Sequence, residues 1–304
     1  MLELRQVNVT FSTNGQMRAV RDVSLIVPDK RVTVMMGETG SGKSVLLLAI
    51  LRLLPPTAIV GGSIALDGRD LLRLSEKDMA QVRGKRISYI PQGNGAAMNP
   101  LMRVGYQVGE PLMVHRGYSV RQAADATLAL LRALDLQNEE QVASQYPHQL
   151  SGGMRQRAMI AMGMAADAAI ILADEPTKGL DPGRIEQVVA AFLRLRGKTV
   201  LCVTHDVDFA EQVAEDVCIL YAGELVECAP RSDFFEEPLH PYANALVMAQ
   251  PKNGLHCTLT FTPHRIPDAC AFWASCPRRM QRCGERPPLV EQGERKVRCW
   301  LYAD

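Results

Sequence analysis

Apolar and polar positions alternate along the first 36 residues. The stretches LELRQVNVTF, RAVRDVSLIVP and RVTVMM predict short β-strands, because successive strand side chains point to opposite faces. Residues 43–54 predict an apolar helix, and GGSIALDGRDL predicts a strand with a turn. Because the N-terminal stretch has the pattern of a strand, we expect no signal-peptide core there.

Helical periodicity dominates residues 94–165 and is clearest in VRQAADATLALLRALDL. Strand-like and helical runs then alternate: AAIILADEP, a helix at 182–196, KTVLCVTHD, a helix at 207–215, and DVCILYAGELVE. This alternation predicts an α/β domain with a mainly parallel sheet. After Pro230 the alternation fades and prolines become frequent. We therefore expect one domain over 1–230 and an irregular extension over 231–304.

Composition narrows the choice of compartment and partner. The 304 residues are 47% hydrophobic, which is ample for a core, and the net charge of +1 gives nucleic-acid binding no support. The apolar runs VLLLAILRLLPP and AMIAMGMAADAAIILA are interrupted by Arg52, by Pro55-Pro56 and by Asp167. Both are shorter than the ~20 apolar residues of a membrane span. The chain is expected to be soluble and cytosolic, with reduced thiols.

The stretch GETGSGKS places Gly37, Gly42, Lys43 and Ser44 between an apolar strand and a helix. Glycines let backbone amides turn toward an anion, and the helix N-terminus adds its dipole. Lys43 would reach the β- and γ-phosphates of a nucleotide, and the Ser44 hydroxyl would bind Mg²⁺. A plain glycine-rich turn is the alternative, but the strand–loop–helix context favours a phosphate-binding loop.

Two further motifs fit a nucleotide enzyme. In IILADE, Asp174 can hold Mg²⁺ through water, and Glu175 is placed to take a proton from an attacking water. In LSGGMRQR, Ser151-Gly152-Gly153 opens a long helix whose amides face an anion. Since one phosphate loop already serves the γ-phosphate within a subunit, this second anion site predicts contact with nucleotide held by another subunit.

Taken together and in order, Gly37–Ser44, YIPQ, LSGGMRQR, IILADE, GLD and VTHD resemble the nucleotide-binding subunit of ABC transporters. The resemblance implies that Phe11 stacks on adenine and that Gln92 contacts Mg²⁺ and water and senses the membrane partner. It further implies that Ser151 and Gly153 bind the opposing γ-phosphate. Asp181 would cross the dimer interface, and His205 would hold the γ-phosphate.

The expected fold is a P-loop (RecA-like) cassette with an antiparallel β subdomain and a helical subdomain at about 94–165. The expected catalytic residues are Glu175, His205 and Gln92, and the expected Mg²⁺ ligands are Ser44, Gln92 and Asp174. The residues expected to contact ATP are Phe11, Gly37, Glu38, Thr39, Gly40, Ser41, Gly42, Lys43, Ser44, Gln92, Ser151, Gly152, Gly153, Asp174 and Asp181.

A single cassette without a coiled-coil insert or membrane spans favours a separate importer ATPase subunit. NGAAMNPLMRVGYQVGEPL and EEPLHPYANAL are similar to segments of oligopeptide, dipeptide and nickel importers. The resemblance implies ATP hydrolysis that energises import of peptides, nickel or a related small solute. Gly93-Asn94 and Lys178-Gly179 depart from the family pattern and weaken any inference about cargo.

The same resemblance implies a place and partners. The chain would sit peripherally on the cytoplasmic face of the inner membrane. Its partners would be a second ATPase subunit (itself or a paralogue), two transmembrane permease subunits and an extracytoplasmic solute-binding protein. The alternative is a soluble ABC-type regulatory or assembly ATPase that is not coupled to transport.

The extension holds four cysteines with the spacing Cys270-x5-Cys276-x6-Cys283-x15-Cys299. The spacing leaves open a zinc site, a [4Fe–4S] cluster and unliganded core thiols, whereas a reducing compartment disfavours disulfides. Resemblance to the importer ATPases favours the [4Fe–4S] cluster, with zinc as the alternative. Cys202 and Cys218 are expected in the core, and Cys228 and Cys257 have no assigned role.

Overall fold

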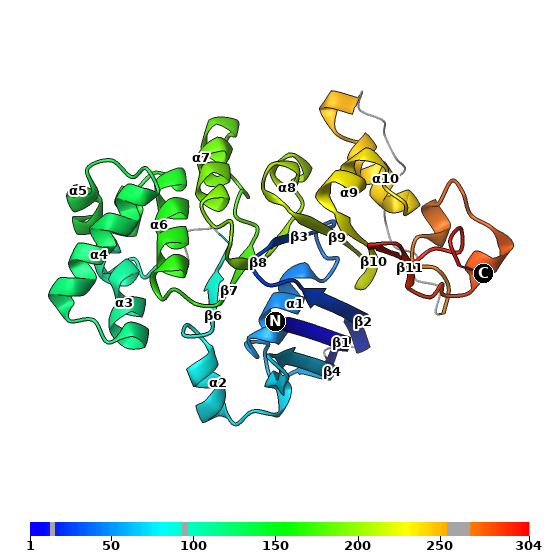
Figure 1. The fold of residues 1–304 in the computed structure, drawn as a ribbon, viewed down its shortest axis with the longest axis horizontal. Coiled ribbons are helices and arrows are strands. Elements are labelled where there is room, and N and C mark those ends of the chain that lie inside the picture. The colour runs from blue at the N-terminus through cyan, green and yellow to red at the C-terminus, as the bar shows by residue number, and fades with distance from the viewer. Residues whose placement is uncertain (13–15, 93–96, 254–267, 304) are drawn as a thin grey trace. The chain divides into compact units, whose positions relative to one another are not determined.

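A computed structural model describes residues 1–12, 16–92, 97–253 and 268–303 (Figure 1). Gly93, Asn94 and Cys257 lie outside these ranges. The chain divides into two compact units. The first holds residues 1–28, 33–72 and 204–304, and the second holds residues 29–32 and 73–203. In the described ranges, no helix is both long and apolar enough to cross a membrane.

The first unit contains an antiparallel sheet in the order β2-β1-β4-β5. Leu2, Leu4, Val7 and Val9 of β1 are buried, so the apolar positions of the sequence pattern form the inner face of this strand. The predicted strands at the N-terminus and in GGSIALDGRDL are confirmed. Their bounds are β1 (Leu2–Ser12), β2 (Gln16–Val27), β4 (Ala58–Leu66) and β5 (Arg69–Asp70).

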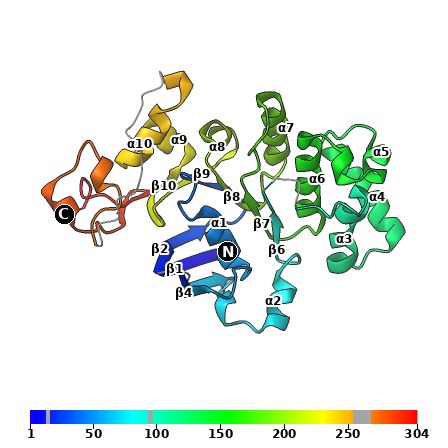
Figure 2. The ribbon, with the colours of Figure 1, turned by 180° about the vertical axis from the view of Figure 1, so that it is seen from behind.

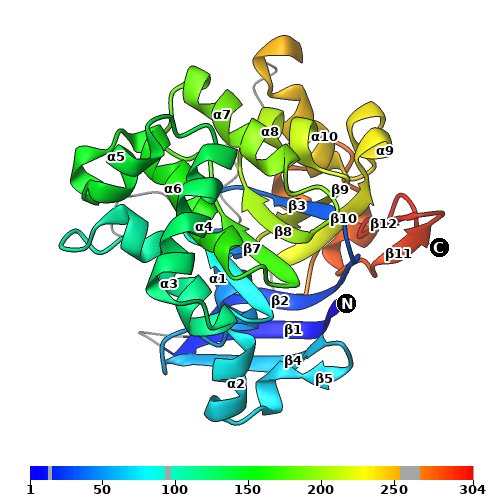
Figure 3. The same cartoon turned by 60° about the vertical axis from the view of Figure 1, so that its left-hand side comes forward.

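A second set of strands in this unit runs β11-β12-β10-β9-β3 (Figure 3). β9 is parallel to β3 and antiparallel to β10, so DVCILYAGELVE forms two strands rather than one. The turn between them falls at Ala222 and Gly223, both with positive φ. The bounds are β3 (Val32–Met36), β9 (Asp216–Tyr221), β10 (Glu224–Pro230), β11 (Val290–Gln292) and β12 (Arg295–Val297).

Helices of the first unit include two in the region expected to be irregular. Pro241 opens the second of these, where a missing amide hydrogen is tolerated because first-turn amides have no helical partner. The extension is therefore more ordered than its prolines suggested, whereas the division predicted at residue 230 stays a prediction. The helices are α1 (Lys43–Ile50), α8 (Val207–Val213), α9 (Arg231–Glu236) and α10 (Pro241–Met248).

The second unit holds a parallel sheet in the order β8-β7-β6, with α3 to α6 gathered beside it (Figure 2). The helices predicted for residues 94–165 are confirmed. Ser119 and Gln122 form a capping box at the start of α4. The strands are β6 (Ile87–Ile90), β7 (Ile170–Asp174) and β8 (Thr199–Thr204). The helices are α2 (Glu76–Val82), α3 (Val104–Arg116), α4 (Val120–Ala133), α5 (Glu139–Ser144), α6 (Gly152–Ala165) and α7 (Pro182–Leu193).

Candidate functional site

The glycine-rich loop of the first unit links β3 to α1 and encloses a buried lysine. Lys43 is 4% exposed, and its ammonium group donates to the carbonyl oxygens of Gly37 (2.6 Å) and Glu38 (2.9 Å). A buried cation held by backbone oxygens is suited to a phosphate group, because charge-assisted hydrogen bonds are strongest away from bulk water. Ser44 follows in the first turn of α1 and is half-buried.

Two glycines of this loop leave no room for a side chain. A Cβ atom on Gly37 would lie 2.2 Å from the carbonyl oxygen of Leu220 in β9. Gly42 has a φ of 103°, and a Cβ there would lie 2.4 Å from the carbonyl oxygen of Ala19 in β2. The loop is therefore fixed by contact with two neighbouring strands as well as by its own conformation.

The loop also contacts an aromatic side chain that the motifs did not predict. The backbone amide of Glu38 donates to the hydroxyl of Tyr242 in α10, at 3.3 Å. Burial raises the pKa of Glu38, and the nearby Lys43 charge opposes this shift. Tyr242 is fully buried, with its ring centroid 4.4 Å from that of Tyr221. The only sequence signal for it was the similarity of PLHPY to importer segments.

Two predicted nucleotide contacts lie elsewhere in the first unit. Phe11 is half-buried in β1, opposite Met17 of β2 and Ala58 of β4. His205 is exposed and directly follows β8, ahead of Asp206, whose carboxylate caps α8. Their predicted contacts with nucleotide remain predictions.

The predicted acidic pair of the second unit lies at the carboxyl end of β7. Asp174 and Glu175 are 5% and 6% exposed. Tyr89 of β6 donates to Asp174 Oδ2 at 3.2 Å, and burial together with the Asp174 charge raises the pKa of Tyr89. Glu175 has a φ of 47° and its amide donates to the Val203 carbonyl oxygen at 2.9 Å. A non-glycine residue in this conformation is strained, as is common where a side chain has a functional position.

Gln92 lies at the same edge of the sheet as the acidic pair. It follows β6 by two residues, and Ile90 of β6 pairs with Ala173 of β7. Within the described residues, the buried Gln92 Nε2 atom has no hydrogen-bond partner. A buried donor of this kind fits an oxygen atom that the described residues do not supply. Carboxylates and an amide oxygen are also the ligands that Mg²⁺ prefers.

The pKa of Cys202, a cysteine of β8 beside the acidic pair, reflects the negative charge at this edge of the sheet. Burial, and then the carboxylates of Glu175 and Asp174, raise the pKa of Cys202 far above its usual range. The thiol therefore stays protonated and behaves as a core side chain, as the sequence predicted. The field that suppresses its ionisation attracts a cation at the same edge.

The LSGGMRQR motif forms the start of α6. Ser151 is its N-cap, and the Ser151 Oγ atom accepts from the Met154 amide at 3.3 Å. A Cβ on Gly153 would lie 3.1 Å from Cδ of Arg184, and Arg184 pairs with the Asp181 carboxylate at 3.0 Å. The structure therefore brings the helix start and Asp181 together around one arginine.

A buried arginine that the sequence analysis missed holds α6 in place. The Arg157 guanidinium donates to the carbonyl oxygens of Gly153 (3.4 Å), Leu134 (3.1 Å) and Asp135 (2.7 Å). Burial lowers its pKa. The second arginine of LSGGMRQR was a usable signal, because a charged residue inside an apolar helix needs buried partners.

The four cysteines of the extension are free thiols that influence one another. Burial, and then the thiols of Cys283, Cys299 and Cys276, raise the pKa of Cys270 to about 12, against the lowering effect of the Phe272 amide. Burial also raises the pKa of Cys276 and Cys299. The Cys270 amide donates to the Cys283 carbonyl oxygen at 3.0 Å. Across the described part of the chain, however, no three His, Cys, Asp or Glu side chains are placed to hold a metal ion.

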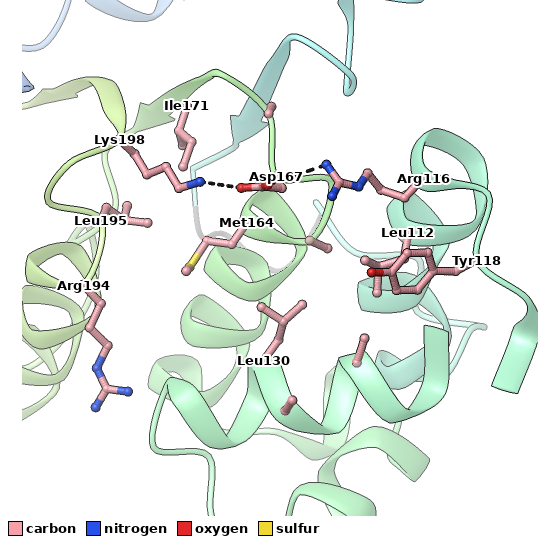
Figure 4. A pocket seen from close by; sticks show the side chains of 14 residues that line it. Leu112, Arg116, Tyr118, Leu130, Met164, Asp167, Ile171, Arg194, Leu195 and Lys198 are labelled. Atoms are coloured by element: carbon pink, nitrogen blue, oxygen red, sulfur yellow. Dashed lines mark hydrogen bonds and ion pairs between the residues drawn. The ribbon is translucent and has the colours of Figure 1, made fainter. Parts of the chain in front are cut away.

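A cavity of about 460 Å³ opens in the second unit at the amino end of β7 (Figure 4). Ile171 lines it, and Asp167 pairs there with Arg116 (3.6 Å) and with Lys198. Asp174 and Glu175 lie at the other end of the same strand. This cavity is therefore distinct from the predicted nucleotide contacts.

Comparison with known proteins assigns the family. The model of the ABC transporter family matches residues 20–178, and that of the oligopeptide/dipeptide transporter C-terminal region matches residues 226–283. The chain belongs to the ABC transporter ATP-binding family. It is 37% identical to the dipeptide transport ATP-binding protein DppD of Bacillus subtilis (strain 168), over 99% of this chain and 94% of that protein. It is 34% identical to the oligopeptide transport ATP-binding protein OppD of Escherichia coli (strain K12), over 96% and 90%.

A solved structure supports the same assignment for the ABC cassette. The dimeric, post-hydrolysis ATP-binding cassette MJ0796 bound to ADP and Pi matches with a TM-score of 0.68 and 31% identity, over 76% of this chain and 99% of that one. The predicted cassette fold and the predicted ATPase class are confirmed. The role of each individual site residue stays a prediction.

Proposed function

We propose that this chain is the ATP-hydrolysing subunit of a peptide importer. The buried Lys43 ammonium inside a loop shaped by Gly37 and Gly42 is the observation that carries the nucleotide site. The peptide cargo is supported by the names of the relatives and by the matched C-terminal region, neither of which mentions nickel.

In this proposal the loop binds the phosphates and the carboxyl end of β7 supplies the reacting groups. Lys43 stabilises the β- and γ-phosphates, and Ser44, Gln92 and Asp174 hold Mg²⁺, which when bound neutralises phosphate charge. Glu175 accepts the proton of the attacking water, and His205 holds the γ-phosphate. Phe11 stacks on the base.

Two cassettes close on the nucleotide, in line with the dimeric state named for the structural relative. Ser151, Gly152 and Gly153 of one subunit face the γ-phosphate bound to the other, and Asp181 lies at the same interface. The Ser151 cap supports this arrangement because it leaves the first amides of α6 pointing outward from the helix start.

A face of α3 is proposed to receive the membrane partners. Tyr106 of α3 is 51% exposed and lines a cavity of about 370 Å³ between α3 and α4, and Leu101, which precedes the helix, is 84% exposed. Exposed apolar side chains beside a cavity suit a permease helix. The proposed assembly has a second ATPase subunit, two permeases and a solute-binding protein, with this chain on the cytoplasmic face of the inner membrane.

The four-cysteine set is proposed to hold a [4Fe–4S] cluster. Cys270, Cys276, Cys283 and Cys299 are reduced, lie within electrostatic reach of one another and have Arg278 and Arg279 nearby to offset thiolate charge. Zinc would require sulfur atoms about 3.8 Å apart, as follows from its tetrahedral bond lengths. Since no three ligands are grouped for a metal ion among the described residues, metal analysis decides between the cluster and zinc.

Iron, sulfide and zinc analysis of anaerobically purified protein tests this assignment. We expect iron and sulfide in equal amounts, a broad visible absorption band, and loss of both in Cys283→Ser. If the analysis found zinc and no sulfide, the four cysteines would be assigned to a zinc site instead of a cluster.

The Glu175→Gln substitution tests the proposed hydrolysis. It keeps the size of the side chain but removes its basicity, so ATP affinity should stay within about twofold while turnover falls by about 100-fold or more. Nucleotide affinity and phosphate release are measured on the same preparation. Glu186→Gln, on the exposed face of α7, is the matched control and should hydrolyse ATP normally.

Normal turnover in Glu175→Gln would remove Glu175 as the base. Co-purification of the Glu175→Gln chain with membrane permeases tests coupling to transport separately. A chain that hydrolyses ATP but never associates with permeases would favour the regulatory ATPase instead.

A further inference from the structure

Two cysteines outside the nucleotide site and the four-cysteine set face each other across β9 and β10. The strand register places Cys218 directly opposite Cys228, and their Sγ atoms lie 2.6 Å apart. Both are free thiols. Opposed residues of an antiparallel pair have Cα atoms about 4.5–5.5 Å apart, within the range of about 4.4–6.8 Å that a disulfide spans. The backbone therefore already has the geometry that a disulfide needs.

The two thiols differ in their surroundings. Cys218 is buried, whereas Cys228 is half-buried and lies opposite Lys296 of β12. The hydrogen bond with Cys228 and burial raise the pKa of Cys218, and the Lys296 charge opposes the shift. Cys228 is therefore the thiol that a small reagent can reach, and Cys218 is placed to resolve the product.

The hairpin that contains this pair is packed against the phosphate-binding loop. Cys218 pairs with Met35 of β3, two residues before Gly37. Further along β9, the Leu220 carbonyl oxygen closes the space beside Gly37. The hairpin turn then donates from the Gly223 amide to the Ser41 carbonyl oxygen at 2.9 Å. A change in the hairpin therefore has a short, continuous path to the loop.

We propose that Cys218 and Cys228 form a reversible disulfide by exchange with low-molecular-weight disulfides, and that this state alters nucleotide affinity. The Cys228 thiolate attacks a sulfur atom of glutathione disulfide and releases one glutathione. The Cys218 sulfur, after losing its proton, attacks Cys228 and releases the second glutathione. The protein loses two electrons and two protons, and glutathione disulfide is reduced to two thiols. The disulfide goes beyond the proposed function, and its effect on affinity rests on the proposed nucleotide site.

Peptide mapping of the full chain tests the modification. The reduced protein is incubated with glutathione disulfide, quenched with acid and alkylated, then cleaved after glutamate. Cleavage after Glu215, Glu224, Glu227 and Glu236 places the two thiols in different peptides, 216–224 and 228–236. We expect these two peptides to be linked by a disulfide, and to separate when the disulfide is reduced. Glutathione retained on Cys228 without a disulfide to Cys218, or two unmodified thiols, would overturn the proposal.

Matched variants identify the reacting atoms. Cys228→Ser should show neither bound glutathione at residue 228 nor a disulfide between the two peptides. In Cys218→Ser the reaction should end with glutathione bound to Cys228. Cys202→Ser, which alters a buried cysteine of β8, should behave as wild type. If a variant fails to fold, a disulfide between the two peptides of the wild-type protein is enough to establish the modification.

Titration with a fluorescent ATP analogue tests the link to the loop. We expect affinity to differ by about fivefold between reduced and oxidised wild type, at the lower end of typical coupling between sites. Cys228→Ser should show no difference. Equal affinity in both states would overturn the regulatory part, whereas absence of binding even in the reduced state would instead contradict the proposed nucleotide site.

Discussion

At the scale of single residues, His240 combines two roles that make it sensitive to acid. It is 2% exposed, and its Nδ1 atom accepts from the Tyr242 amide at 3.1 Å, which caps α10. Burial lowers its pKa to about 3 from the ordinary 6.5. Protonation would therefore place an uncompensated charge in the core and remove the cap.

We expect His240→Asn to reduce the loss of stability in acid. With a folded pKa below the unfolded value, the contribution of neutral His240 is fully present above pH 6.5 and is lost as pH falls toward 3. Between pH 7 and pH 5 this amounts to about 2 kcal/mol. Asn retains a capping acceptor and does not titrate.

The measurement is urea unfolding at the two pH values. Both tryptophans, Trp273 and Trp300, lie in the extension, so their fluorescence follows the unit that contains His240. Other titrating groups, including Glu227, are common to both proteins and cancel in the comparison. An equal loss of stability in wild type and variant would contradict the assignment.

Among single residues, those whose identity the chemistry requires were the easiest to predict. Gly37, Gly42 and Lys43 belong to a motif with fixed spacing, and steric contact leaves no room for a side chain at the two glycines, so the motif indicated their location in the fold. Tyr242 and Arg157 act through contacts with segments far away in the chain, at Glu38 and Leu134. A local pattern can mark such a residue, but it does not identify the distant partner.

At the scale of elements, α6 is fixed at its first turn by one buried guanidinium. Arg157→Met would leave the carbonyl oxygens of Leu134 and Asp135 without this donor, at a cost of about 3 kcal/mol. We expect hydrogen exchange at α6 amides to be about 100-fold faster in the variant. Arg194→Met is the control, because Arg194 is 44% exposed in its pair with Asp135 and such pairs contribute under about 1 kcal/mol. Unchanged exchange in Arg157→Met would show that α6 is held by other contacts.

Elements with strong periodicity, such as α4, α7 and β7, were predicted within a few residues. The short elements α2, β11 and β12 were not, because segments of three to seven residues contain too little periodic signal. β11 and β12 depend on pairing with β10, which is distant in sequence. Tertiary contact, rather than local propensity, determines these strands.

At the scale of the whole molecule, partly buried ion pairs join the extension to the rest of the first unit. Arg286 lies 3.0 Å from both Glu224 of β10 and Asp22 of β2, and the Glu224 side chain is 1% exposed. Among the described residues, Arg286→Met would leave Glu224 paired with Arg21, at the longer distance of 3.5 Å. We expect this variant to weaken docking of the extension by about 2 kcal/mol.

Tryptophan fluorescence during urea unfolding measures the loss. Adding Glu224→Gln to Arg286→Met should recover at least half of it, because the buried carboxylate that has lost its nearer partner is then removed. Lys296→Met is the control, since its partner Glu291 is 72% exposed. If the effects of Arg286→Met and Glu224→Gln on the free energy of unfolding were additive in the double variant, the ion pair would have no measurable role.

The phosphate-binding loop shares its compact unit with the segment that follows Pro230, which limits where this polypeptide can be shortened. Removing everything after that proline would strip Tyr242 from the Glu38 amide and leave Glu224 and Glu227 without Arg286 and Arg295. The truncation would also expose the Tyr221 ring, which packs against Tyr242 and Phe272. We therefore expect a version of this ATPase without its cysteine-bearing tail to be less stable than the full chain.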